Sequence, residues 1–362
     1  MIRIGILLGL IIFGRKIVNT RSIMSEWIDC YYQSVAAGFY PLTTKKEKTL
    51  ESVILSDMVQ NYYQEFVPIL QYRTDYNEQD ERKLVQNDYY DFKDDETTDE
   101  IVEEVKKENK KFRIKRWESP TYLRKYIYQI DSTTMATNSE LNGKILLNMD
   151  LKLKKSYKPQ VLIYHTHGSE TYRDSKRGEK SDTVIGVGDV LTKKLRQKNI
   201  KVIHDRNIYD MKNGKEERSK AYNYAAEAIE RHLKKYPSIQ VVIDLHRDGV
   251  SEKTKLVTTQ KGTKMAQIMF FNGMSRTAKN GDIKYLKNPN KQKNLAFSLQ
   301  LQAQAVKKYP GFTRKIYVKG YRYNLHYKGR SLLVEVGAQN NTISQAKASM
   351  SLLAELLNNV LY

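Results

Sequence analysis

The sequence predicts an α/β domain whose mixed or parallel sheet is covered by helices on both faces. Short apolar runs of strand length alternate with longer amphipathic segments along residues 117–362. This alternation is typical of βαβ units, in which each helix crosses the sheet and returns the chain to the same edge. Several apolar runs end in histidine or glutamate, so we expect a ligand site beyond the carboxyl ends of the strands.

Six segments have the composition of buried strands, and four have the period of helices. The strands are expected at 159–167, 200–205, 239–246, 266–273, 314–320 and 331–337, and the helices at 181–199, 223–236, 292–309 and 342–361. Ser181 or Asp182 is the expected N-cap of the first helix. Gly186 and Gly188 each disfavour that helix by about 1 kcal/mol. We therefore expect these glycines to permit close packing.

Two further regions precede this domain. Residues 1–20 contain an apolar run, Ile4–Gly14, with basic residues on both sides. A membrane-spanning helix needs about 20 apolar residues and a signal-peptide core about 7–15, so the run is interpreted as an export signal that is kept as a membrane anchor. Residues 21–116 are predicted to be helical at first and then an acidic stalk. Residues 75–111 have too few aliphatic side chains to form a core, which predicts disorder or a loose helix there.

The composition limits the chemistry. The formal net charge of +21 predicts attraction to a polyanion such as nucleic acid, a membrane surface or a cell-wall polymer, although a solvated basic face explains it equally well. Cys30 is the single cysteine, which excludes intramolecular disulfides, four-cysteine zinc sites and iron–sulfur clusters. Any metal must therefore be held by histidine, aspartate or glutamate.

The stretch VLIYHTHGSE, residues 161–170, ends an apolar run in two histidines and a glutamate. Because side chains alternate along a strand, His165 and His167 are expected on the same face. Glu170 follows the turn at Gly168 and Ser169. His167 and Glu170 therefore form an H-x-x-E pair of candidate metal ligands.

Two other strands end in comparable residues. IDLHRDG (243–249) places His246 at the end of an apolar run, and LLVEVG (332–337) places Glu335 inside one. A carboxylate in an apolar strand is unfavourable unless it is paired, hydrogen-bonded or close to a metal. Catalytic zinc takes three His, Glu or Asp ligands and a water, and a further carboxylate can act as the base. The three strand ends therefore offer a sufficient set for a zinc site: two histidines and one glutamate as ligands, and one further glutamate as the base.

Other polar residues have weaker support. Arg247 is a candidate for binding a substrate carboxylate or the developing oxyanion, although a salt bridge within its loop explains it equally well. Asn324 is a candidate for holding a substrate amide, and it equally suits a turn. His204, His232 and His326 are interpreted as structural histidines.

These motifs resemble stage II sporulation protein P, a family of spore-forming Firmicutes. The similar segments are PQVLIYHTHGSETY (159–172), VGDVLTKKL (187–195), VIHD (202–205), YPSIQVVIDLHRDG (236–249) and LLVEVGAQNNT (332–342), preceded by LNGKILLNMDLKL (141–153). The resemblance covers about residues 120–362. It implies an amidase type 3 fold and a zinc-dependent N-acetylmuramoyl-L-alanine amidase that also cleaves peptide cross-links. It further implies a membrane-anchored protein outside the cytoplasm, in the septum between mother cell and forespore. There it would degrade peptidoglycan during engulfment, with stage II sporulation proteins D and M as partners.

The resemblance also suggests roles for individual residues. His167 matches the first zinc histidine, His246 the last, and Glu335 the catalytic glutamate. The glutamate ligand is assigned to Glu170, but the amidase type 3 pattern has it further along the chain, where this sequence offers Glu179 or Asp182 instead. His165 is either an additional site residue or a partner behind the ligands. Leu325 stands where the family tends to have glutamine, and the N-terminal apolar run is shorter than a full membrane span.

Other functions remain compatible with the same residues. A zinc carboxypeptidase also uses H-x-x-E, a later histidine and a late glutamate, and would recruit an arginine such as Arg247. A non-catalytic protein that binds cell wall would need neither zinc nor Glu335. Nucleic-acid binding has the charge in its favour, but the sequence has no motif for it.

Overall fold

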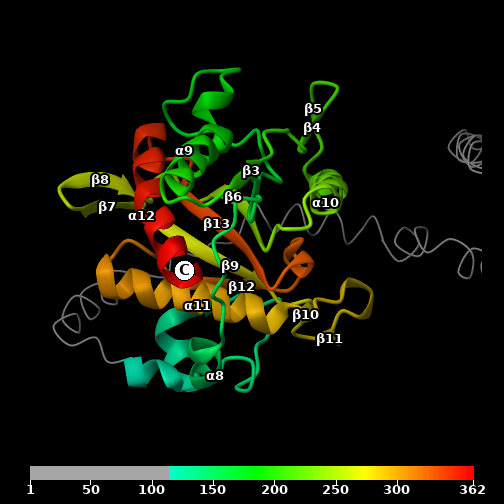
Figure 1. The fold of residues 1–362 in the computed structure, drawn as a ribbon, viewed down its shortest axis with the longest axis vertical. Coiled ribbons are helices and arrows are strands. Elements are labelled where there is room, and N and C mark those ends of the chain that lie inside the picture. Colours follow the sequence, from blue (N-terminus) through cyan, green and yellow to red (C-terminus); the bar gives the residue numbers. More distant parts are fainter. Residues whose placement is uncertain (1–113) are drawn as a thin grey trace, which may run out of the picture. The chain divides into compact units, whose positions relative to one another are not determined.

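A seven-stranded mixed sheet lies at the centre of residues 114–362, the part of the chain that the computed structural model describes (Figure 1). In spatial order its strands are β1 (Tyr128–Ile130), β12 (Ile316–Lys319), β9 (Ile268–Gly273), β13 (Arg330–Ala338), β6 (Val241–Asp248), β2 (Val161–Tyr164) and β3 (Val202–His204). β13, β6, β2 and β3 are parallel, whereas β9 pairs antiparallel with β13 and parallel with β12, which in turn is parallel to β1. The prediction of an α/β fold with a mixed or parallel sheet is confirmed, and most of the strand pairs are parallel.

The order of the strands places a switch point between β2 and β6. From β2 the chain passes to β3 on one side, and it then returns to β6 on the other side. Crossover connections that diverge in this way leave a crevice at the carboxyl ends of the two strands, which is where ligands bind in open α/β sheets.

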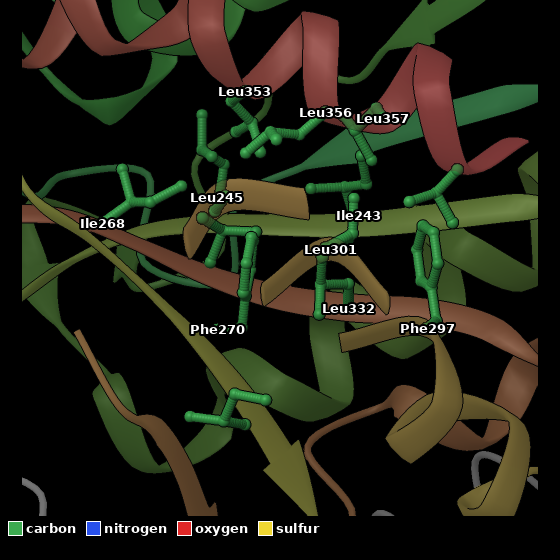
Figure 2. Packing of buried hydrophobic residues seen from close by; sticks show 14 of the residues in the cluster. Ile243, Leu245, Ile268, Phe270, Phe297, Leu301, Leu332, Leu353, Leu356 and Leu357 are labelled. Atoms are coloured by element: carbon green, nitrogen blue, oxygen red, sulfur yellow. The ribbon is translucent and has the colours of Figure 1, made fainter. Parts of the chain in front are cut away.

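Three helices cover one face of the sheet: α9 (Val184–Gln197), α11 (Lys291–Lys308) and α12 (Ile343–Leu361). Alternate strand residues such as Val161, Ile243 and Leu332 are fully buried against them. Figure 2 shows α12 leucines above Ile243 and Leu245 of β6. Burial of this continuous aliphatic layer is the main stabilising term of the fold, at about 25 cal/mol for each Å² removed from water.

The opposite face is covered by α10 (Arg218–Lys235) and by the segment around 321–325. The remaining strand residues, such as Leu162 and Val242, pack against the alanines of α10. Met269 and Leu333 pack against Tyr323 and Leu325. The two faces therefore differ in their cover: three long helices on one, and one helix and a loop on the other.

Local signals fix the helix ends. Thr342 caps α12 in a capping box with Gln345, and Thr183 caps α9. Position 186 of α9 accepts only glycine, because a Cβ there would stand 1.9 Å from the carbonyl oxygen of Ser181. The prediction that this glycine permits close packing is confirmed. The six predicted strands and four predicted helices are all present, with bounds that differ by a few residues.

Smaller elements were not anticipated from the sequence. The segment before β2 forms η2 (Ile114–Glu118), α7 (Pro120–Tyr122), η3 (Leu123–Ile127) and α8 (Gly143–Asn148), and α8 packs on α11. Hairpins are formed by β4 (Met211–Lys212) with β5 (Lys215–Glu216), β7 (Val257–Gln260) with β8 (Thr263–Ala266), and β10 (Arg276–Thr277) with β11 (Gly281–Asp282). Short turns of helix are η4 (Lys180–Asp182), η5 (Lys284–Leu286) and η6 (Leu325–Tyr327).

The predicted export signal and almost all of the predicted stalk lie outside the described residues. Within residues 114–362, no helix is both long and apolar enough to cross a bilayer.

Candidate active site

The candidate site lies where β2, β6 and β13 end, at the switch point of the sheet. His246 of β6 and Glu335 of β13 are direct neighbours in the parallel register. Both residues alternate with core residues that face the three-helix layer, so their side chains belong to the α10 face. The structure thus brings together two residues that are 89 positions apart in the sequence and that the strand patterns had singled out.

The two histidines of the opening motif lie on different faces of the sheet. β2 ends at Tyr164 and residues 166–169 form a turn, so strand alternation does not continue to His167. His165 contacts His204 and the carbonyl of Leu245. The ring of His167 packs edge-on against those of His246 and Tyr222, with ring centres 5.2 and 5.6 Å apart. The expectation that His165 and His167 share a face was wrong, because the strand ends at Tyr164 and the turn begins at Thr166, two residues before the expected turn at Gly168.

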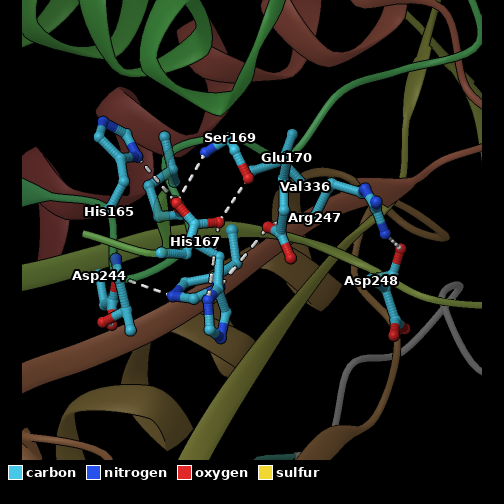
Figure 3. A network of polar contacts seen from close by, with 12 residues as sticks. His165, His167, Ser169, Glu170, Asp244, Arg247, Asp248 and Val336 are labelled. Carbon is cyan, nitrogen blue, oxygen red and sulfur yellow. Dashed lines mark hydrogen bonds and ion pairs between the residues drawn. The ribbon is translucent and has the colours of Figure 1, made fainter. Parts of the chain in front are cut away.

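Buried hydrogen bonds hold the 165–170 segment against the end of β6. Thr166 donates to Asp244 through its backbone N–H (2.9 Å) and its hydroxyl (2.6 Å). Glu170 accepts at Oε2 from the backbone N–H of Arg247, at 3.1 Å. Figure 3 shows Glu170 pointing from this segment toward the end of β6. The ladder of backbone hydrogen bonds between β2 and β6 is therefore continued by carboxylate side chains beyond the last strand residue.

Asp244 orients the ring of His246. Nε2 of His246 lies 2.8 Å from Oδ1 of Asp244, and Nδ1 lies 3.6 Å from Oε2 of Glu170. Burial alone would lower the pKa of His246, but the Asp244 and Glu170 carboxylates outweigh it and raise this pKa to about 10. In the protein without metal, His246 is therefore protonated and its Nδ1 side faces Glu170.

His167 is electrostatically different. Burial, the His246 charge and the nearby arginines hold its pKa well below the usual range, so its ring is neutral. Its Nδ1 is buried and has no hydrogen-bond partner among the described residues, and the nearest carboxylate oxygen, Oδ2 of Asp210, is 3.9 Å away. Asp210 instead accepts from the backbone N–H and hydroxyl of Ser169. A neutral imidazole with a free ring nitrogen is the state in which histidine binds a metal.

Glu170 is the carboxylate that the structure places against His246. Its Oε1 accepts from Arg218, the first residue of α10, at 3.0 Å. Glu179 is exposed before η4, and Asp182 accepts from the backbone N–H of Lys176. The geometry therefore favours Glu170 over these two alternatives as the acidic ligand.

Within residues 114–362, no cationic side chain forms an ion pair with Glu335. Its Oε2 is buried and has no hydrogen-bond partner in the described part of the chain. Burial, with help from the Asp248 and Glu170 charges and against that of His246, raises the pKa of Glu335 to about 8. A β-bulge follows directly, and Gly337 has a φ of 61° there. Tyr172 donates its hydroxyl to the carbonyl of Val336 at 3.1 Å, which fixes the backbone beside Glu335.

His167, Glu170 and His246 fit a zinc ion as far as the donor atoms are concerned. Two atoms bound to one tetrahedral zinc lie about 3.3 Å apart, close to the 3.6 Å between His246 Nδ1 and Glu170 Oε2. Within residues 114–362, no three side chains already form a complete metal-binding group. The reason is that both oxygens of Glu170 accept hydrogen bonds from arginines and His246 is turned to Asp244.

The two weaker candidates take part in local structure. Arg247 donates from its guanidinium to the carbonyls of Thr171 and Asp248, rather than to a carboxylate. Asn324 has a left-handed backbone (φ 55°), as does Tyr323 before it (φ 46°). The side chain of Asn324 donates to the carbonyl of Tyr222 at 2.8 Å. Asn324 therefore fixes the residue whose ring packs on His167, and its role toward a substrate stays a prediction.

Sequence reasoning missed several residues that build this site: Thr166, Asp210, Arg218, Tyr222 and Asp244. A signal for Asp244 was present, since it stands two residues before His246 in the same apolar strand and must share its face. No comparable signal marks Asp210 or Arg218, which reach the site from the loop and helix after β3.

Comparisons with known proteins identify a family. The family model described as stage II sporulation protein P matches residues 44–358. Stage II sporulation protein P of Bacillus subtilis (strain 168) is 25% identical over 218 residues, which are 56% of this chain and 51% of that protein. The chain thus matches about half the length of this curated relative.

Two solved structures are similar to part of the chain. They are the CwlD amidase from Clostridioides difficile in complex with the GerS lipoprotein, and the N-acetylmuramyl-L-alanine amidase Ami1 from Mycobacterium abscessus in its apo form. Each is 13% identical with a TM-score of 0.34, and each match covers 56% of this chain and nearly all of the other (98% and 97%).

We expect the left-handed conformation of Asn324 to be measurable in stability. Asn324→Ala removes the hydrogen bond to Tyr222 and places alanine, which adopts the left-handed conformation less readily than asparagine or glycine, at this position. Asn324→Gly removes the same hydrogen bond but tolerates the conformation. The alanine variant should therefore be less stable than the glycine variant by about 1 kcal/mol, measured by urea unfolding of the full chain. Equal stabilities would show that the backbone changes conformation in the variants.

The raised pKa of Glu335 predicts a pH-dependent stability in chelator-treated protein. The native state holds this proton up to about pH 8, whereas the unfolded chain releases it at about pH 4.3. The native state therefore binds more protons between these values, and its stability falls as pH rises through this window. Glu335→Gln has no carboxyl group at this position and lacks this pH dependence. Between pH 5 and pH 8, wild type should therefore lose about 1 kcal/mol or more of its free energy of unfolding relative to Glu335→Gln. Parallel curves for the two proteins would contradict the raised pKa.

Proposed function

This chain belongs to the stage II sporulation protein P family, and we propose that it is a zinc-dependent peptidoglycan hydrolase. The bond we propose is the amide between the lactyl group of muramic acid and L-alanine, with peptide cross-links as a second target. The observation that carries the proposal is that His167, Glu170 and His246 lie together at the carboxyl ends of β2 and β6, with Glu335 of β13 beside His246. Family membership supports a role in sporulation.

The residues of the site have distinct tasks in this reaction. When bound, zinc supplies Lewis-acid chemistry, since it polarises a carbonyl and makes water more acidic. His167, Glu170 and His246 would hold it, and Asp244 keeps the His246 ring in its orientation. Glu335, the strand neighbour of His246, takes the proton from the attacking water in its ionised form and returns it to the leaving amine.

The charge of the described domain suits an anionic polymer. Residues 114–362 carry 46 lysines and arginines against 21 aspartates and glutamates. Such a surface attracts a polyanionic wall and raises the local concentration of substrate. We propose that the protein works outside the cytoplasm, anchored through its N-terminus at the septum between mother cell and forespore during engulfment. Stage II sporulation proteins D and M are the proposed partners.

Zinc binding is the first expected outcome. Chelator-treated full chain should take up one zinc ion, and His167→Ala, His246→Ala or Glu170→Gln should each weaken its affinity by about 100-fold. The matched control for Glu170→Gln is Glu179→Gln, because both remove one carboxylate from the loop before α9. His232→Gln is the control for the histidines. Normal binding by Glu170→Gln together with loss in Glu179→Gln would reassign the acidic ligand.

The reaction itself is tested on purified sacculi. Full chain loaded with zinc should release stem peptides that begin with L-alanine, detected by mass spectrometry of the soluble fragments. Glu335→Gln should bind zinc normally and release less by about 100-fold or more, because the proton acceptor is gone.

Other products would favour other functions. Release of single terminal amino acids would identify a carboxypeptidase. Sacculi that stay intact with both proteins bound to them would contradict hydrolysis by the isolated chain and favour a wall-binding protein, with added partner proteins as the next comparison.

A further inference from the structure

A pair of histidines lies behind the candidate site, on the face of the sheet that the helices α9, α11 and α12 cover. His165 is fully buried, and its Nε2 lies 2.8 Å from Nε2 of His204. Its Nδ1 lies 2.8 Å from the carbonyl oxygen of Leu245, the residue before His246. On the outer side, Nδ1 of His204 lies 3.1 Å from Asp189, a residue of α9. The contacts form an unbroken chain from α9 through β3 and the end of β2 to β6.

The protons of His165 are fixed by its neighbours. A carbonyl oxygen only accepts, so Nδ1 of His165 must donate to Leu245. A neutral imidazole then has a lone pair at Nε2, which accepts from the Nε2–H of His204. Both ring nitrogens of His165 are therefore occupied by protein groups. His165 is not free to bind a metal or a substrate without breaking this chain.

Gly188 leaves the space in which the two rings meet. A Cβ at this position of α9 would stand 2.6 Å from Nε2 of His204 and 2.8 Å from Nε2 of His165. Contacts below 3.0 Å require a shift. The His165 ring is held at its other nitrogen by the hydrogen bond to the Leu245 carbonyl, and Nδ1 of His204 lies 3.1 Å from Asp189. A side chain at Gly188 would thus separate the rings at the atoms that form the hydrogen bond.

We propose that His165 and His204 are positioning residues for the site on the opposite face. The pair holds the start of the 165–170 segment to the carbonyl that precedes His246, and so sets the distance between His246 and the two ligands on that segment, His167 and Glu170. β2 pairs with β6 only as far as Tyr164 and Asp244. The His165 side chain therefore provides a link to β6 just beyond the last backbone pair. This inference concerns the shape of the site and rests on the proposed zinc ligands only in its second test.

The first test needs no metal. The chain has six histidines, so selective ¹⁵N-histidine labelling gives a tractable NMR spectrum of the full chain. Chelator-treated wild type should show His165 protonated at Nδ1, with scalar coupling across the N–H···N bond to His204. Gly188→Ala should abolish the coupling and also shift the ring signals of His167 and His246, which lie on the other face of the sheet. Lys193→Ala, an exposed change in the same helix, should alter neither.

The second test uses zinc alone as the probe, in competition with a coloured chelator. Gly188→Ala should weaken zinc affinity by about tenfold, the size of effect seen when residues behind metal ligands are changed. His204→Leu should weaken zinc affinity to a similar extent. His204→Gln should keep most of the wild-type affinity, because its amide can donate a hydrogen bond to His165. These two variants keep the test valid should Gly188→Ala fail to fold.

The outcomes separate this inference from the proposed function. Coupling lost in Gly188→Ala with unchanged His167 and His246 signals would overturn the positioning role, whatever the zinc result. So would equal zinc affinities for His204→Leu and His204→Gln. Absence of zinc binding in wild type would overturn the proposed metal site, and the NMR comparison would still decide whether the histidine pair positions the two rings.

Discussion

The site depends on the contact between the 165–170 segment and the last residues of β6. Three residues of β6 form hydrogen bonds with the segment. Asp244 accepts from Thr166, the Leu245 carbonyl accepts from His165, and the backbone N–H of Arg247 donates to Glu170. Backbone pairing between β2 and β6 stops at Tyr164. Without these bonds the segment would be an ordinary surface loop, and His167 and Glu170 would have no fixed position relative to His246.

Each of these bonds is strong because it is buried. Asp244 and His165 are fully excluded from solvent, and Glu170 is nearly so. A hydrogen bond to a charged group in such surroundings contributes about 1.5–3 kcal/mol, and an unsatisfied partner costs at least as much. The segment therefore has one favourable position, and partial detachment would leave carboxylates buried without donors. This cooperativity explains why a turn rich in small and polar residues can hold a precise geometry.

The sequence was sufficient for the parts of the site that lie on strands. His246 and Glu335 follow from apolar runs that end in polar residues, and the alternation of β6 would also have assigned Asp244 to the same face. The turn after Tyr164 could not be placed, because nothing in HTHGSE says at which residue a strand stops pairing. His165 consequently lies on the far face with His204. Arg218 reaches the site from the start of α10, and Asp210 reaches it from the loop before this helix. Both contacts depend on how α10 packs on the sheet, and no sequence motif at the start of α10 indicates that packing.

The buried carboxylates around the site differ in whether they have a cationic partner. Glu170, Asp244 and Asp248 are buried, and each has a cationic partner in Arg218, His246 and Arg314 respectively. Within residues 114–362, Glu335 has no ion-pair partner, and Asp210 lies 3.9 Å from the neutral His167. The pKa of each carboxyl is raised chiefly by burial. Metal binding at His167, Glu170 and His246 would remove the proton from His246 but add two positive charges beside Glu335. The net gain in positive charge would lower the pKa of Glu335 and ionise it at neutral pH. A cation bound there would thus make water more acidic and would also favour the ionised form of Glu335, the residue that we propose as the base.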